Sequence, residues 1–177
     1  MTHLDALDLL RCHAPISFGW AEVVVGHDFG LLSLAEIQAW VRSQPPLGPE
    51  ARKLAALSGQ ELLRFEETLW AACVEATGTR LPRPGHRRWA LAQDLWRTAL
   101  LKEALLEPLD EAGFGEAVET IVDRVGCPED MHGLLHRGQA WARTRARADR
   151  LAVMTFVAKL ERSLLDQETG WRALAAS

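Results

Sequence analysis

Signals that start and stop helices recur at short intervals along this chain. Ser33-Leu34-Ala35-Glu36 and Ser58-Gly59-Gln60-Glu61 both have the capping-box pattern, in which serine and glutamate side chains each accept the other residue's backbone amide. Pro45-Pro46 ends the first of these helices, because a residue before proline is driven out of the α region. Apolar residues then recur at helical spacing, as in Leu62, Phe65, Leu69 and Cys73. These signals predict an all-α fold.

The amino-acid composition favours the same fold class. Leu and Ala supply 54 of the 177 residues, whereas Ile occurs three times and Tyr is absent. Such small and straight-chain residues prefer helix to strand. With 48% hydrophobic and 25% charged residues, the chain has the composition of a globular protein. We therefore expect residues 1–177 to form a single compact multi-helix domain.

Two helical halves are expected within that domain. Residues 1–77 and residues 87–177 flank a loop, residues 78–88, that holds two prolines and two glycines. In the second half, the stripe of Val153, Val157, Leu160 and Leu164 predicts a long helix over residues 139–166.

Residues near Val23-Val24-Val25 leave two alternatives open. Ser17 is suited to cap a helix that carries Trp20 and the valines toward Gly26. The valines are β-branched, however, and favour a strand. A small hairpin near residues 23–31 is therefore the alternative to a helix.

The cysteines and the first residues indicate a soluble protein of the cytoplasm. Cys12, Cys73 and Cys127 are far apart and odd in number, which predicts no disulfide framework. Asp5 and Asp8 stand where a signal peptide would need basic and apolar residues, and no stretch approaches the roughly 18–20 apolar residues of a membrane span. We expect no membrane partner, and the oligomeric state stays open.

One group of residues has the character of metal ligands: Cys127, Glu129, His132 and His136. Two histidines four residues apart lie on one face of a helix, as in some zinc sites. The glutamate that follows the first histidine in metalloproteases is missing, and the Glu-x-x-His motif of di-iron bundles occurs once instead of twice. A surface histidine pair without metal is the favoured interpretation, and a metal-dependent hydrolase that uses Cys127, His132 and His136 is the alternative.

Motifs of covalent and nucleotide chemistry give no support to an enzyme. The chain contains neither G-x-S-x-G nor G-x-x-x-x-G-K-[ST], and no G-x-G-x-x-G follows a strand. We therefore lean toward a non-catalytic protein and expect no cofactor.

Charge is segregated along the chain. Residues 103–130 contain nine acidic side chains and one arginine, a local balance of −8 on a chain of net charge −4. The residues that we expect to contact a basic protein partner are Glu107, Asp110, Glu111, Glu116 and Glu119.

Arginines gather just beyond the acidic residues. Residues 137–150 contain five arginines, predicted to lie on a helix, and residues 80–88 contain four. The acidic side chains could pair internally with Arg143, Arg145 and Arg147, since charge runs often neutralise one another. A nucleic-acid-associated regulator that uses the arginine-rich helix is a further alternative, but the net acidic charge of the chain argues against a nucleic-acid partner.

Three stretches together resemble a known family. They are residues 16–37, which include Ile16-Ser17-Phe18-Gly19-Trp20 and Leu31-Leu32-Ser33, then Leu54-Ala55-Ala56-Leu57-Ser58, then Val125-Gly126-Cys127-Pro128-Glu129-Asp130. These stretches resemble an uncharacterised family of small bacterial helical proteins, a domain of unknown function with some members suspected to be toxin-immunity proteins. The resemblance carries over no catalytic residue. It implies an intracellular binding protein that neutralises a bacterial toxin.

Overall fold

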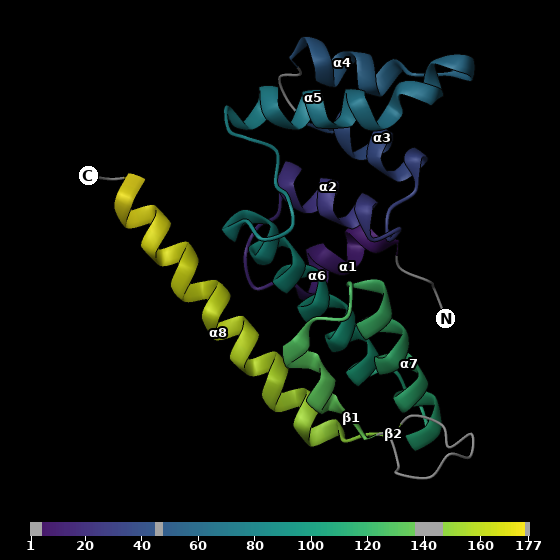
Figure 1. The fold of residues 1–177 in the computed structure, drawn as a ribbon, viewed down its shortest axis with the longest axis vertical. Helices are drawn as coiled ribbons and strands as arrows, with labels where there is room; N and C mark the ends of the chain where they lie inside the picture. Colours follow the sequence, from purple (N-terminus) through teal and green to yellow (C-terminus); the bar gives the residue numbers. More distant parts are fainter. Residues whose placement is uncertain (1–4, 45–47, 137–146, 176–177) are drawn as a thin grey trace. The chain divides into compact units, whose positions relative to one another are not determined.

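The computed structural model describes residues 5–44, 48–136 and 147–175 of the chain (Figure 1). Within these ranges the secondary structure consists of eight α-helices, two short 3-10 helices and one pair of two-residue strands. The protein is therefore all-α, as the sequence predicts. Among the described helices, none combines the length and the apolar character needed to cross a membrane.

The chain forms two compact units. The first unit comprises Met1–Leu7 and Phe18–Ala92, and the second comprises Asp8–Ser17 and Gln93–Ser177. Helices α1 (Ala6–His13) and α6 (Arg87–Leu106) therefore contribute residues to both units.

The first unit is built from four whole α-helices and one 3-10 helix. In this unit α5 packs against α4 and α2, and α3 packs against α4. Its core includes Val41, Leu54 and Leu69, all fully buried. The bounds of these elements are α2 (Trp20–Asp28), α3 (Leu34–Arg42), α4 (Pro49–Ala56), η1 (Gly59–Arg64) and α5 (Phe65–Thr77).

Helix α2 settles the alternative at the three valines. Val23, Val24 and Val25 are helical and fully buried, so the hairpin near residues 23–31 is wrong. Burial of three adjacent side chains outweighs the weaker strand preference of β-branched residues. The helix begins after Gly19 instead of Ser17, and the Gly19 amide donates a 2.7 Å hydrogen bond to Glu22 Oε2.

The two predicted capping boxes have different outcomes. At the start of α3 the box is confirmed, because Ser33 and Glu36 exchange hydrogen bonds of 2.7 and 3.3 Å. Ser58 makes no capping hydrogen bond, and the 3-10 helix η1 follows it in place of an α-helix. Gly59 has a φ of 55°, outside the range of a right-handed α-helix, so no α-helix starts at Gly59 and α5 begins at Phe65.

The second unit contains most of α1, the C-terminal part of α6 and five further elements. Its largest fully buried side chains include Trp96, Phe114, Met131 and Leu164. Strands β1 and β2 pair antiparallel, with Leu135 opposite Ala148. The bounds are α7 (Glu111–Arg124), η2 (Glu129–Leu134), β1 (Leu135–His136), β2 (Arg147–Ala148) and α8 (Arg150–Ala175).

The long helix starts later than predicted. Residues 147 and 148 are in β2, and α8 begins at Arg150, so the helix expected from residue 139 is wrong for residues 147–149. Asp149 explains the start, because its carboxylate accepts the Leu151 amide at 2.9 Å in the manner of a helix cap. The remainder of the predicted arginine-rich helix, residues 137–146, lies outside the described residues.

Candidate functional site

Arg150, the first residue of α8, holds three segments of the second unit together. Its guanidinium donates hydrogen bonds to the Leu105 carbonyl at 3.1 Å and the Leu109 carbonyl at 2.8 Å, with a longer one to the Glu107 carbonyl at 3.5 Å. It also lies over the Phe114 ring, 4.2 Å from the ring centroid. Carbonyls at the end of a helix lack intrahelical partners, so Arg150 satisfies groups that α6 leaves open. The start of α8 is thereby fixed to the connection between α6 and α7.

Large apolar side chains are exposed on the segments that Arg150 holds. Leu106 lies between Leu105 and Glu107 and is 70% exposed. Leu151 follows Arg150 and is 69% exposed, and Met154, almost one helical turn further along, is 55% exposed. We call Leu106, Leu151 and Met154 the apolar patch. Exposed apolar side chains mark an interaction site where they form a contiguous surface.

The predicted acidic residues lie on the connection and on α7. Glu107 is half-buried on the connection, Asp110 caps α7 by accepting the Gly113 amide at 2.7 Å, and Glu111 is in the first turn of that helix. Glu116 lies further along α7 and is exposed, and Glu119, almost one turn later, is half-buried. We call Glu107, Asp110, Glu111, Glu116 and Glu119 the acidic surface.

Three more acidic side chains of residues 103–130, outside the acidic surface, also have partners within the second unit. Glu103 contacts His13 at 2.8 Å, and Asp130 forms a 2.6 Å ion pair with Arg97. Asp123 accepts a hydrogen bond from the Cys127 thiol at 3.5 Å. Part of the acidic charge in residues 103–130 is therefore engaged in ion pairs and hydrogen bonds inside the fold. Internal pairing with Arg143, Arg145 and Arg147 stays a prediction, because those side chains lie outside the described part of the chain.

The predicted metal ligands are not arranged on one helical face. Cys127 has a φ of 52° in the turn that follows α7, His132 is exposed on the 3-10 helix η2, and His136 belongs to β1. Met131 and Leu134 of η2 are buried in the core, whereas His132 is exposed to solvent. Among the side chains that the structure describes, which do not include that of His136, no three histidine, cysteine, aspartate or glutamate residues gather closely enough to hold a metal ion.

A charge cluster around the buried Arg97 in the second unit could not be recognised from residue spacing alone. Arg97 is buried and forms 2.6 Å ion pairs with both Asp94 and Asp130, and its guanidinium lies 5.4 Å from the Phe156 ring centroid. Burial raises the pKa of Asp94 above its ordinary value, although Arg97 opposes this shift. Asp94 and Arg97 are three residues apart on α6, which is a detectable signal, but Asp130 is distant in sequence. The cluster fixes η2 to α6.

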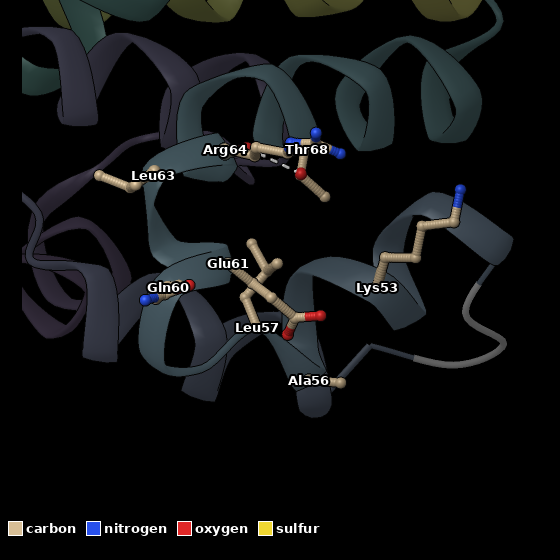
Figure 2. A pocket seen from close by; sticks show the side chains of 8 residues that line it. All are labelled: Lys53, Ala56, Leu57, Gln60, Glu61, Leu63, Arg64 and Thr68. Atoms are coloured by element: carbon tan, nitrogen blue, oxygen red, sulfur yellow. Dashed lines mark hydrogen bonds between the residues drawn. The ribbon is translucent and has the colours of Figure 1, made fainter.

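An open hollow of about 650 Å³ lies in the first unit between α4, η1 and the start of α5. In Figure 2, Leu57 and Glu61 lie between Gln60 and Lys53, and Arg64 and Thr68 lie across the hollow from them. Lys53 pairs with Glu50 at 2.6 Å, and Thr68 donates a hydrogen bond to the Arg64 carbonyl at 2.8 Å. The lining therefore combines both signs of charge, and several of its polar groups are already engaged.

Comparison with known proteins found no match among protein-family models, curated proteins or solved structures. The resemblance to the family of small bacterial helical proteins therefore stays a prediction.

Proposed function

We propose that this protein is a non-catalytic binding protein that recognises a basic protein partner through the apolar patch and the neighbouring acidic surface. The observation that carries the proposal is the position of Arg150. Its hydrogen bonds to the carbonyls of Leu105 and Leu109 fix the segments that expose Leu106 and Leu151. The same connection carries Glu107 and Asp110, and Glu111 begins α7 directly after it.

Apolar and acidic residues would have separate roles in such an interface. Leu106 and Leu151 are mostly exposed, and burying each against a partner would contribute roughly 1–2 kcal/mol. Acidic side chains around them would attract a basic surface and accelerate association, with less effect on the final affinity. An apolar centre with a charged rim is a common arrangement in protein interfaces.

A bacterial toxin is the partner that we propose, in line with the family resemblance. Toxins that cleave nucleic acids need a basic surface to bind phosphates. Carboxylates at Glu107, Asp110, Glu111, Glu116 and Glu119 would occupy the places of those phosphates and block the surface. On this proposal the protein is an immunity protein.

Photo-crosslinking in the source cells tests the proposal. A photoreactive p-benzoylphenylalanine replaces Leu106 in one variant and Leu63 in a control, because Leu63 is also highly exposed but lies in the first unit. We expect crosslinking from position 106, to a protein that mass spectrometry identifies as basic, and no crosslink to that protein from position 63. An acidic partner, or equal crosslinking from both positions, would overturn the proposal.

A further inference from the structure

A second hollow, of about 540 Å³, lies in the first unit at the C-terminal end of α5. It is lined almost wholly by carbon atoms of residues from α5 and from the loop that leads to α6: Val74, Arg80, Leu81, Arg83 and His86. The polar atoms of Arg80, Arg83 and His86 contribute little to its surface. The apolar patch and the acidic surface are parts of the second unit, so neither includes this hollow.

Local hydrogen bonds give the loop a defined path. Gly78 ends α5 with a φ of 60°, and its amide donates to the Val74 carbonyl at 2.9 Å. Thr79 then accepts a 3.1 Å hydrogen bond from Arg88 of α6. A turn closed by the His86 amide and the Arg83 carbonyl at 3.0 Å completes the loop. The loop is thus held by contacts of the chain itself at Gly78, at Thr79 and between Arg83 and His86.

Charge in this loop has a single sign. Residues 78–88 contain four arginines and one histidine but no acidic residue. Arg80 and Arg83 are exposed, and neither forms an ion pair or a side-chain hydrogen bond with another described residue. Guanidinium groups bind carboxylates and phosphates through paired hydrogen bonds. Val74, which is 42% exposed, and Leu81 offer an apolar surface beside these donors.

We propose that this hollow binds a small amphiphilic anion. The carboxylate or phosphate group of the ligand contacts Arg80 and Arg83, and its apolar body lies against Val74 and Leu81. An anion without an apolar body would lose the contacts with the apolar side chains, and an alcohol of the same length would lose the paired hydrogen bonds.

Calorimetric titration of the full chain tests the proposal with four probes: octanoate, octyl phosphate, octanol and acetate. We expect octanoate or octyl phosphate to bind, and the tighter of the two identifies the preferred head group. Octanol and acetate should bind at least about tenfold more weakly, because each lacks one of the two kinds of contact. Added NaCl should weaken binding of the anions and leave octanol unaffected.

Paired variants locate the site. The double substitution Arg80→Gln and Arg83→Gln should weaken octanoate binding by at least about tenfold, the loss expected when a charge-assisted contact is removed. A control double substitution, Arg52→Gln and Arg64→Gln, makes the same charge change at exposed positions of the first unit and should leave binding unchanged. Val74→Ser should weaken octanoate but not acetate.

Three results would overturn the proposal: no binding of either anion, equal binding of octanol and octanoate, or equal effects of the two double substitutions. Far-UV circular dichroism confirms that each variant is folded before titration. If the Arg80 and Arg83 variant does not fold, the salt dependence and the octanol comparison on the unaltered chain decide the question.

Discussion

Replacing Arg150 by alanine removes the side chain that fixes α8 to the connection between α6 and α7. Two of its hydrogen bonds, of 3.1 and 2.8 Å, have good distances, and the third, at 3.5 Å, is too long to count. Hydrogen bonds to charged groups contribute roughly 1.5–3 kcal/mol, but Arg150 is only half-buried and water replaces part of the loss, so we assign about 1 kcal/mol to each.

The ring contact adds to this loss. The guanidinium lies 4.2 Å from the Phe114 centroid, a distance at which a cation and a ring attract by about 1 kcal/mol. We therefore expect Arg150→Ala to lower the free energy of unfolding by about 3 kcal/mol, or the midpoint of thermal unfolding by about 6–12 °C.

Urea unfolding followed by far-UV circular dichroism measures the effect. Arg162→Ala is the matched control, because Arg162 is exposed on the same helix. It should change the free energy of unfolding by less than about 0.5 kcal/mol. Equal effects of the two substitutions would refute the role that we assign to Arg150. Arg150→Lys should give an intermediate loss, since lysine keeps the charge but cannot reach two carbonyls in the same geometry.

Three further predictions test the account of the fold by urea unfolding. Ser33→Ala should lower the free energy of unfolding by about 1 kcal/mol, because it removes a capping hydrogen bond. Ser58→Ala removes no capping hydrogen bond and should have almost no effect. Equal losses from the two substitutions would contradict our description of the two capping boxes. Leu164→Ala should lower the free energy of unfolding by about 2–5 kcal/mol, because this side chain is fully buried. Leu165→Ala should change it little, because Leu165 is 45% exposed. A larger loss for Leu165→Ala than for Leu164→Ala would show that our assignment of the buried face of α8 is wrong. Burial raises the pKa of Glu22, so this carboxyl keeps its proton to a higher pH in the folded state than in the unfolded state. The free energy of unfolding should therefore fall as pH rises from the ordinary pKa of glutamate through the raised pKa of Glu22. Glu22→Gln should remove that part of the pH dependence, and an unchanged pH profile would contradict the shift.

The sequence predicts the helices well where a local signal and burial agree. The Ser33 box forms as expected, and Phe65, Leu69 and Cys73 are buried on α5. Leu62, the first residue of the same predicted stripe, lies instead on η1 and is 37% exposed. At Ser58 the same four-residue pattern gives a different result, because the pattern does not include the backbone angle that Gly59 adopts. The valines of α2 show the opposite case, in which tertiary burial outweighs a local preference.

The candidate site could be predicted only in part. Charge counting locates the acidic residues, because the excess lies in one continuous stretch of the chain. It gives no indication of Arg150, which contacts carbonyls more than 40 residues away, or of the exposure of Leu106 and Leu151. Helical spacing also places His132 and His136 together wrongly, since one lies on a 3-10 helix and the other on a strand. Contacts between distant segments and changes of helix type leave no local sequence signal.

The central claim is that the acidic surface recognises a basic partner. The most direct test is the affinity of the crosslinked partner, once purified, for a variant that carries Glu111→Lys, Glu116→Lys and Glu119→Lys. A control with Glu61→Lys, Glu67→Lys and Asp166→Lys has the same net charge and changes exposed residues elsewhere. We predict association at least about tenfold slower for the first variant at low salt, a difference that shrinks as salt is added, with the free energy of unfolding preserved. Equal association of both variants would contradict the claim, and a loss of stability in the first variant without its partner would show that these carboxylates are paired inside the fold.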